Sequence, residues 1–134
     1  MRALPLTLSE LIGRPVPFAE FLGIQIVKNQ PGLARLEMAL RPELLNSYHD
    51  AHGGVVMTLA DVALAVAAIT QDGTARGAIT VDLSVSFIGP GKGTLVAEAR
   101  CLRAGKVLAF SEGEIRDAGG SLVAKAIGTF KLRR

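Results

Sequence analysis

An almost wholly apolar run from residue 55 to residue 69 is the feature that most restricts how this chain can fold. Only Thr58 and Asp61 are polar within it. A helix that is apolar on all sides is normally a buried one. We therefore expect one long helix, beginning near Gly53, at the centre of the molecule.

The segments on both sides of this helix predict mainly strands. Two short helices are expected within residues 1–23, because "TLSE" at 7–10 has capping-box spacing and Pro17 suits a helix start. Two strands with a turn at 31–32 come next, and strands at about 79–87, 94–103, 106–117 and 121–132 follow the long helix. A flat sheet of that many strands cannot be covered by one helix. The prediction is a single α+β domain, residues 1–134, with a curved, mostly antiparallel sheet wrapped around the helix.

The clearest alternation of apolar and polar residues lies directly after the long helix. It predicts a strand with one buried face and one polar face. The expected buried residues are Ile79, Val81, Leu83, Val85 and Phe87. The expected polar face is formed by Thr80, Asp82, Ser84 and Ser86.

Charge and cysteine content exclude several classes of protein. The formal net charge is +3, but the basic residues are scattered and form no stripe with interleaved aromatics, which argues against a nucleic-acid partner. The single Cys101 excludes an internal disulfide and fits a reducing compartment as a buried structural thiol. No signal peptide is recognised, and the run 55–69 is too short for a membrane span, so we expect a cytoplasmic protein without a membrane partner.

The carboxylate of Asp61 is unusual for a core helix. It shares one narrow face of small or polar residues, spaced by three or four, with Gly54, Thr58, Ala65 and Ala68. This face would allow a second surface to approach closely. A buried carboxylate either finds a structural partner, such as Thr58 or a backbone amide, or serves a reaction, and perturbed carboxylates in clefts tend to be functional.

The Gly53-Gly54 pair places bare backbone amides at the start of the helix. Such N–H groups lack helical partners and suit a phosphate, a carboxylate or an oxyanion, although the glycines can also serve only a sharp turn. Gly53 and Asp61 are eight residues, or about 12 Å, apart on one helix. If both act on one bond, they must come from two copies of the chain, so this chemistry requires a dimer with two equal sites.

The pattern N-x5-HGG-x4-L-x-D resembles the signature of hotdog-fold acyl-CoA thioesterases of the phenylacetyl-CoA (PaaI-like) branch. Its residues here are Asn46, His52, Gly53, Gly54, Leu59 and Asp61. The stretches "ITVDLSVSFIGPGKG" and "GSLVAKAIGTFKL" are also similar, so the resemblance runs from about Phe18 to the C-terminus. It implies the hotdog fold and a homodimer that often pairs into a tetramer.

The resemblance also implies roles for individual residues. Asp61 would be the nucleophile or the general base, and the Gly53 amide would polarise the thioester carbonyl. Asn46 and His52 would position the thioester or the water, and Thr80 would place a hydroxyl beside the acid. The remaining candidates are substrate contacts: Gly54 and Thr58 on the small face, Phe18 near the acyl group, and Lys92, Arg103 and Lys106 near the phosphates of coenzyme A.

The predicted reaction is hydrolysis of an aromatic (phenylacetyl-type) or medium-chain acyl-CoA, with no cofactor and no metal. A non-catalytic hotdog protein that binds acyl-CoA or another apolar ligand is the main alternative. A metal hydrolase using His49, His52 and Asp61 is less favoured, because their spacing matches no common zinc site. Hotdog dehydratases use different spacings, and the absence of a GxSxG motif argues against an α/β-hydrolase.

Overall fold

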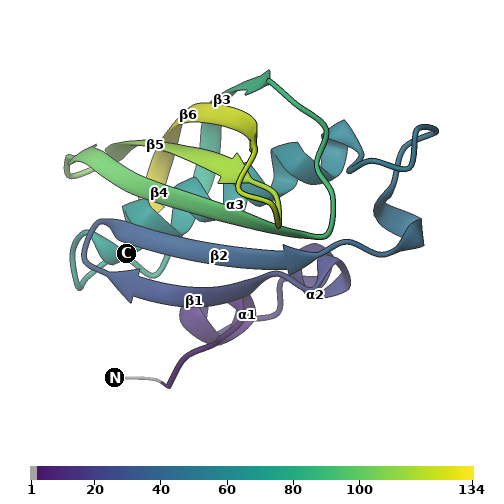
Figure 1. Cartoon of the computed structure of the whole chain (residues 1–134). Helices are drawn as coiled ribbons and strands as arrows, with labels where there is room; N and C mark the ends of the chain where they lie inside the picture. Colours follow the sequence, from purple (N-terminus) through teal and green to yellow (C-terminus); the bar gives the residue numbers. More distant parts are fainter. Residues whose placement is uncertain (1–2) are drawn as a thin grey trace.

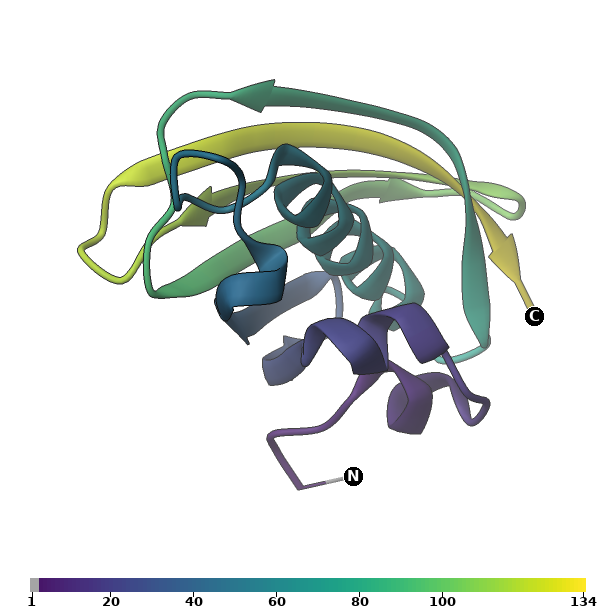
Figure 2. The same ribbon diagram turned by 90° about the vertical axis from the view of Figure 1, so that its right-hand side faces the viewer.

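The computed structural model describes residues 3–134 as one curved sheet wrapped around one long helix (Figures 1 and 2). Two short helices and two strands precede the long helix, and four strands follow it. The elements are α1 (Leu8–Ile12), α2 (Pro17–Leu22), β1 (Gln25–Gln30), β2 (Leu33–Ala39), the 3-10 turn η1 (Pro42–Leu44), α3 (Gly53–Thr70), β3 (Gly77–Phe87), β4 (Thr94–Ala104), β5 (Leu108–Arg116) and β6 (Leu122–Arg133). The predicted curved antiparallel sheet around one long helix is confirmed. The first two residues of the predicted helical segment 1–23 lie outside the described residues.

The two short helices form where the sequence predicts. Thr7 and Glu10 make the reciprocal bonds of a capping box at the start of α1. Pro17 occupies the first turn of α2, and Gly23 ends that helix at a φ of 73°. Glycine adopts this left-handed conformation without the penalty that a Cβ would bring.

The sheet has the strand order β1-β2-β4-β5-β6-β3, and every neighbouring pair is antiparallel. Its two edges differ. The β1 edge is extended by Leu6, which exchanges two backbone hydrogen bonds with Ile26. Along β3, the described residues form ladder hydrogen bonds only with β6. The edge at β3 is therefore open for pairing with another strand.

Helix α3 packs closely onto the concave face of the sheet because two glycines make room for it. A Cβ added at Gly113 would lie 3.0 Å from Leu64 Cδ1 and 2.6 Å from the carbonyl oxygen of Glu98. At Gly128 it would lie 3.2 Å from Leu64 Cδ2. Leu64 is fully buried over these two positions. Their missing side chains set the distance between helix and sheet.

The helix is longer than the apolar run that predicted it. It has 18 residues, which is enough by length and composition alone to cross a membrane, so the expectation that it is too short is wrong. Its apolar character has a local explanation, because ten of its residues are buried, most of them against the surrounding sheet and the N-terminal segment. Cys101 packs against the same core from β4 but is only half-buried, so the prediction of a fully buried thiol is wrong.

The predicted alternation along β3 is interrupted by a β-bulge. The register with β6 shifts between Thr80 and Asp82, so Val81 has no partner on β6. Thr80 pairs with the buried Phe130, on the helix side of the sheet. The bulge therefore places Ile79 on the outer face, and the prediction that Ile79 and Val81 are buried is wrong. Their side chains are 48% and 59% exposed.

Beyond the bulge Leu83 and Val85 pack against the core as predicted, whereas Phe87, also predicted to be buried, is more than half exposed. The predicted small face of α3 is half-buried at Gly54, Thr58 and Ala65. Ala68 is fully buried, so its assignment to the open face is wrong. Ala78, at the start of β3, also packs against the core.

Candidate active site

Asp61 lies halfway along α3 and is half-buried in the described chain. Thr80 donates a hydrogen bond from Oγ1 to Asp61 Oδ1 at 2.6 Å. Burial raises the pKa of the Asp61 carboxyl above its ordinary value of 3.8, and the bond from Thr80 opposes this shift. Thr58, which the sequence offers as a structural partner for Asp61, donates instead to the carbonyl oxygen of Gly54 at 2.8 Å.

The bulge at Val81 brings the hydroxyl of Thr80 to Asp61. Alternation alone places Thr80 on the polar outer face, whereas the family resemblance places it beside the acid. One unpaired residue reverses the order of inward and outward side chains along the strand. Thr80 therefore faces the helix before the bulge, and Leu83 faces it after the bulge.

His52 is the N-cap residue of α3. Its Nδ1 accepts a hydrogen bond from the Gly54 amide at 2.9 Å, so the neutral ring carries its proton on Nε2. A Cβ at Gly54 would lie 3.2 Å from Nδ1, which explains the glycine at this position. The cap leaves the Nε2–H of the exposed His52 ring for a hydrogen bond to a ligand.

Gly53 has no comparable structural explanation. Its φ is not in the left-handed region, and an added Cβ would make only ordinary contact with the Phe87 ring at 3.7 Å. Within residues 3–134 no acceptor is found for the Gly53 N–H. A free amide at the positive end of a helix is suited to a partly negative oxygen.

Phe87 was missed as a site residue because the alternation counts it among the core residues. It lies on the helix side of β3, but its side chain is 55% exposed and its ring adjoins Gly53. Its position at the last residue of the strand, two residues before Gly89-Pro90, is the available sequence signal.

Asn46 shapes the loop before the helix. Its Oδ1 accepts hydrogen bonds from the amides of Tyr48 at 2.9 Å and Asp50 at 3.1 Å. This loop turns through His49, whose φ is 62°. No hydrogen bond joins Asn46 to His52 among the described residues. The side-chain oxygen of Asn46 is therefore committed to the loop, and only its amide nitrogen is left to position a ligand.

The predicted catalytic residues form two groups in one chain. Asp61 and Thr80 meet at the middle of α3, and His52 and Gly53 lie at its N-terminal end. The helical rise separates the two groups by about 12 Å. Within residues 3–134 no group of three or more His, Cys, Asp and Glu side chains is arranged to hold a metal ion.

The predicted substrate contacts are also divided. Lys92 lies near the N-terminal end of α3, because the amide of Ala51 bonds to the Gly91 carbonyl beside it. Arg103 and Lys106 lie at the far end of the 11-residue strand β4, roughly 30 Å away. One nucleotide cannot contact all three within one chain. Phe18 is exposed on α2, and no described contact joins it to either catalytic group.

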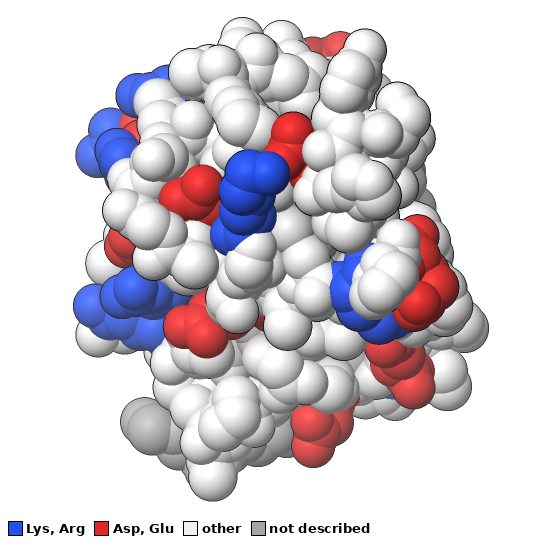
Figure 3. Space-filling view, turned by 45° about the vertical axis from the view of Figure 1, so that its right-hand side comes forward, with Lys and Arg blue, Asp and Glu red and all other residues white. Residues whose placement is uncertain are grey.

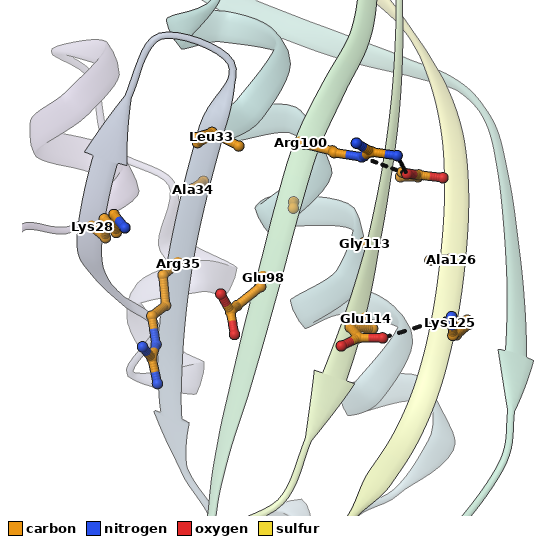
Figure 4. A pocket seen from close by; sticks show the side chains of 12 residues that line it. Lys28, Leu33, Ala34, Arg35, Glu98, Arg100, Gly113, Glu114, Lys125 and Ala126 are labelled. Atoms are coloured by element: carbon orange, nitrogen blue, oxygen red, sulfur yellow. Dashed lines mark hydrogen bonds and ion pairs between the residues drawn. The ribbon is translucent and has the colours of Figure 1, made fainter. Parts of the chain in front are cut away.

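Charged side chains of both signs are mixed on the face seen in Figure 3 and in a hollow on the sheet. A hollow on the outer face of the sheet is lined by both signs, with ion pairs Arg100–Glu112 and Lys125–Glu114 (Figure 4). It lies on the opposite side of the sheet from α3, so it is separate from Asp61.

Comparisons with known proteins agree with this geometry. Residues 48–124, more than half of the chain, match the thioesterase superfamily. A Saccharolobus solfataricus protein, provisionally named an esterase, is 30% identical and covers 95% of this chain and 91% of its own length. Human acyl-coenzyme A thioesterase 13 is 32% identical, covering 86% of this chain and 84% of its own.

A solved structure, the PaaI protein of the E. coli phenylacetic acid degradation operon, superimposes with a TM-score of 0.80. It is 29% identical and covers 89% of this chain and 86% of its own. These matches extend over the sheet, the central helix and the segment that carries His52, Gly53 and Asp61. The chain belongs to the thioesterase superfamily, whose members are hotdog-fold thioester hydrolases.

Proposed function

We propose that this protein hydrolyses the thioester of an acyl-CoA to a free acid and coenzyme A, with Asp61 as nucleophile or general base. The observation that carries this proposal is the contact of Asp61 with Thr80 on the half-open face of an otherwise apolar helix. The hydroxyl fixes one carboxylate oxygen, and the other is left to attack a carbonyl or to activate water. Coenzyme A is part of the substrate, and we propose no separate cofactor.

The Gly53 amide would stabilise the oxyanion. A thioester carbonyl is already electrophilic and its thiolate leaves readily, so a carboxylate and one oxyanion donor can suffice. The unexplained glycine supports this role, because a missing side chain allows a carbonyl oxygen to reach the amide. His52 Nε2–H and the Asn46 side-chain amide would position the thioester or the water beside it.

The two groups would meet across a homodimer. Two β3 edges paired about a two-fold axis would continue the sheet and place two α3 helices antiparallel, so that Gly53 of one copy faces Asp61 of the other. The open edge of β3 and the small residues on the open face of α3 support this arrangement. Pairing of two dimers into a tetramer and a cytoplasmic location remain predictions from the sequence.

The acyl group is proposed to be aromatic, of the phenylacetyl type, or a medium-length chain. The similarity to PaaI favours an aromatic acyl group. The exposed rings of Phe87, beside Gly53, and Phe18, on α2, offer apolar surface for either kind. Gly54 and Thr58 would allow the substrate to run close to the helix.

The test is thioester hydrolysis by wild type and Asp61→Asn, followed by thiol release from aryl-, medium- and long-chain acyl-CoAs. Light scattering checks that the oligomer is the same. We expect turnover by the wild type, with preference for aryl or medium chains, and a loss of about a hundredfold or more in the variant.

Two outcomes would contradict the proposal. Wild type that binds acyl-CoA without turnover would identify a binding protein instead of an enzyme. An Asp61→Asn variant as active as wild type would show that another group performs the chemistry.

A further inference from the structure

A hollow at the N-terminal end of α3 is lined by three basic side chains, Arg41, His49 and Lys92. They come from three segments that are distant in sequence: the residues after β2, the loop before α3, and the β3–β4 connection. Leu40 and Leu45 form part of the apolar lining of the hollow.

Carboxylates hold the two permanent cations in place without entering the hollow. Lys92 Nζ donates to Asp50 Oδ1 at 2.5 Å, and Arg41 Nε donates to Glu43 Oε2 at 3.0 Å. Neither Asp50 nor Glu43 lines the hollow. The hollow therefore presents positive side chains, while the balancing negative charge lies beside it.

Arg41 is further fixed by Phe21. Its guanidinium carbon lies 4.8 Å from the centre of the Phe21 ring, and Nη2 donates to the Phe21 carbonyl oxygen at 2.5 Å. A guanidinium already held over a ring and by a carbonyl loses little conformational freedom when it binds a phosphate. Its Nη1 group has no described partner among residues 3–134 and is available for a ligand.

The hollow is built by the segments that also carry the proposed oxyanion donor. The amide of His52 donates to the Leu44 carbonyl at 3.0 Å, and the amide of Ala51 donates to the Gly91 carbonyl at 3.0 Å. These bonds tie the start of α3 to the chain before Leu45 and to the loop that carries Lys92. A substrate whose carbonyl lies at Gly53 would therefore have the hollow on the same end of the molecule.

We infer that this hollow binds the phosphate groups of coenzyme A through Arg41 and Lys92, with His49 also in its lining. The inference rests on the proposed function, and it selects Lys92 from the three cations that the sequence offers. Arg gives a planar pair of donors and Lys a point charge, and both are common ligands of phosphate. Arg103 and Lys106 of the same chain lie too far along β4 to join them.

The test compares Lys92→Gln, Arg41→Gln and the double variant with wild type on an acyl-CoA and on the same acyl group carried by pantetheine, which has no phosphates. Lys131→Gln, at an exposed position on β6, is the matched loss of one charge. Lys92→Arg tests whether the charge alone is needed. Binding of coenzyme A itself is measured by calorimetry, so that a result is obtained without turnover.

We expect KM for acyl-CoA to rise about three- to tenfold in each single variant and more in the double variant, with kcat and the pantetheine reaction unchanged. Binding of coenzyme A should weaken in parallel and lose part of its salt dependence, while Lys92→Arg and Lys131→Gln remain close to wild type. Equal losses on both substrates, or coenzyme A affinity unchanged in the double variant, would overturn the inference. Wild type that binds coenzyme A through these residues without hydrolysing any thioester would support the phosphate site and contradict the proposed function.

Discussion

The two faces of helix α3 differ in what covers them. On the covered face, Leu64 fills the space left by Gly113 and Gly128, and the helix touches the sheet through apolar atoms. On the open face, Thr58 and Asp61 are only half-buried, and the carboxylate is held by one hydroxyl from β3. Packing within the described chain accounts for the covered face, and it leaves the open face for the substrate and the second chain that we propose.

The open face also carries an energetic penalty. Partial burial raises the pKa of the Asp61 carboxyl, because its charged form loses hydration. A chain selected only for stability would place an apolar or neutral residue there. The covered and open faces can therefore be separated by variants that change stability and activity independently.

The largest effect is expected on the covered face. Leu64→Ala should lower the free energy of unfolding by about 2–5 kcal/mol, because it leaves a cavity above two glycines that cannot fill it. Denaturant unfolding measures this loss, and kcat of the folded protein should stay within about threefold of wild type. Leu33→Ala, at an exposed position on β2, is the control and should cost less than about 1 kcal/mol. A small loss at Leu64 would show that helix and sheet are less tightly packed than described.

The two adjacent glycines at the start of α3 are expected to differ, with Gly53 needed for activity and Gly54 for stability. Gly53→Ala should leave stability unchanged or slightly higher, because its Cβ meets only ordinary contact with Phe87, while kcat falls about tenfold or more from crowding of the oxyanion site. Gly54→Ala should lower stability by about 1 kcal/mol, because its Cβ displaces the His52 cap. Thermal unfolding measures the stability of both variants, and thiol release measures their turnover. A Gly53→Ala enzyme with wild-type turnover would remove the amide from the proposed mechanism.

The smallest effect is expected on the pH dependence of activity, which depends on Asp61 on the open face. Activity that needs ionised Asp61 should fall as the pH drops through the raised pKa of this carboxyl, above the ordinary 3.8. In Thr80→Val the bond that lowers this pKa is lost, so the acid limb of the kcat/KM profile should move to higher pH. The profile is measured at constant ionic strength, with Ser84→Ala as the control on the same strand. An acid limb that does not move would show that Thr80 does not tune the acid.

The order of elements could be predicted because local patterns specify it. The capping box at Thr7 and the apolar run around Leu64 depend on neighbouring residues alone. The chemistry of Asp61 was indicated by a polar residue in an apolar helix, and the family resemblance added Thr80. The contact between them was beyond the pattern, because alternation continues through Val81 without any sign of an extra residue.

Three-dimensional assembly accounts for the remaining differences. Ala68 has the spacing of the open face, but the chain covers the last turns of the helix. Phe87 has the spacing of the core, yet it lies at the end of β3, where the described chain leaves more than half of it exposed. The hollow lined by Arg41 and Lys92 brings together segments about fifty residues apart in sequence. Local sequence patterns do not predict such a long-range arrangement.

The bulge in β3 shows that a residue without a contact in the site can still control the geometry of the site. Val81 forms no described hydrogen bond with Asp61 or with the helix. Its presence nevertheless determines which side chains of β3 face the helix, and therefore that Thr80 is the one that reaches Asp61. Removal of this one residue would leave every functional group in the chain and would turn the hydroxyl of Thr80 outward. In relatives of this protein, the spacing between the acid and the hydroxyl is therefore as informative as the two residues themselves.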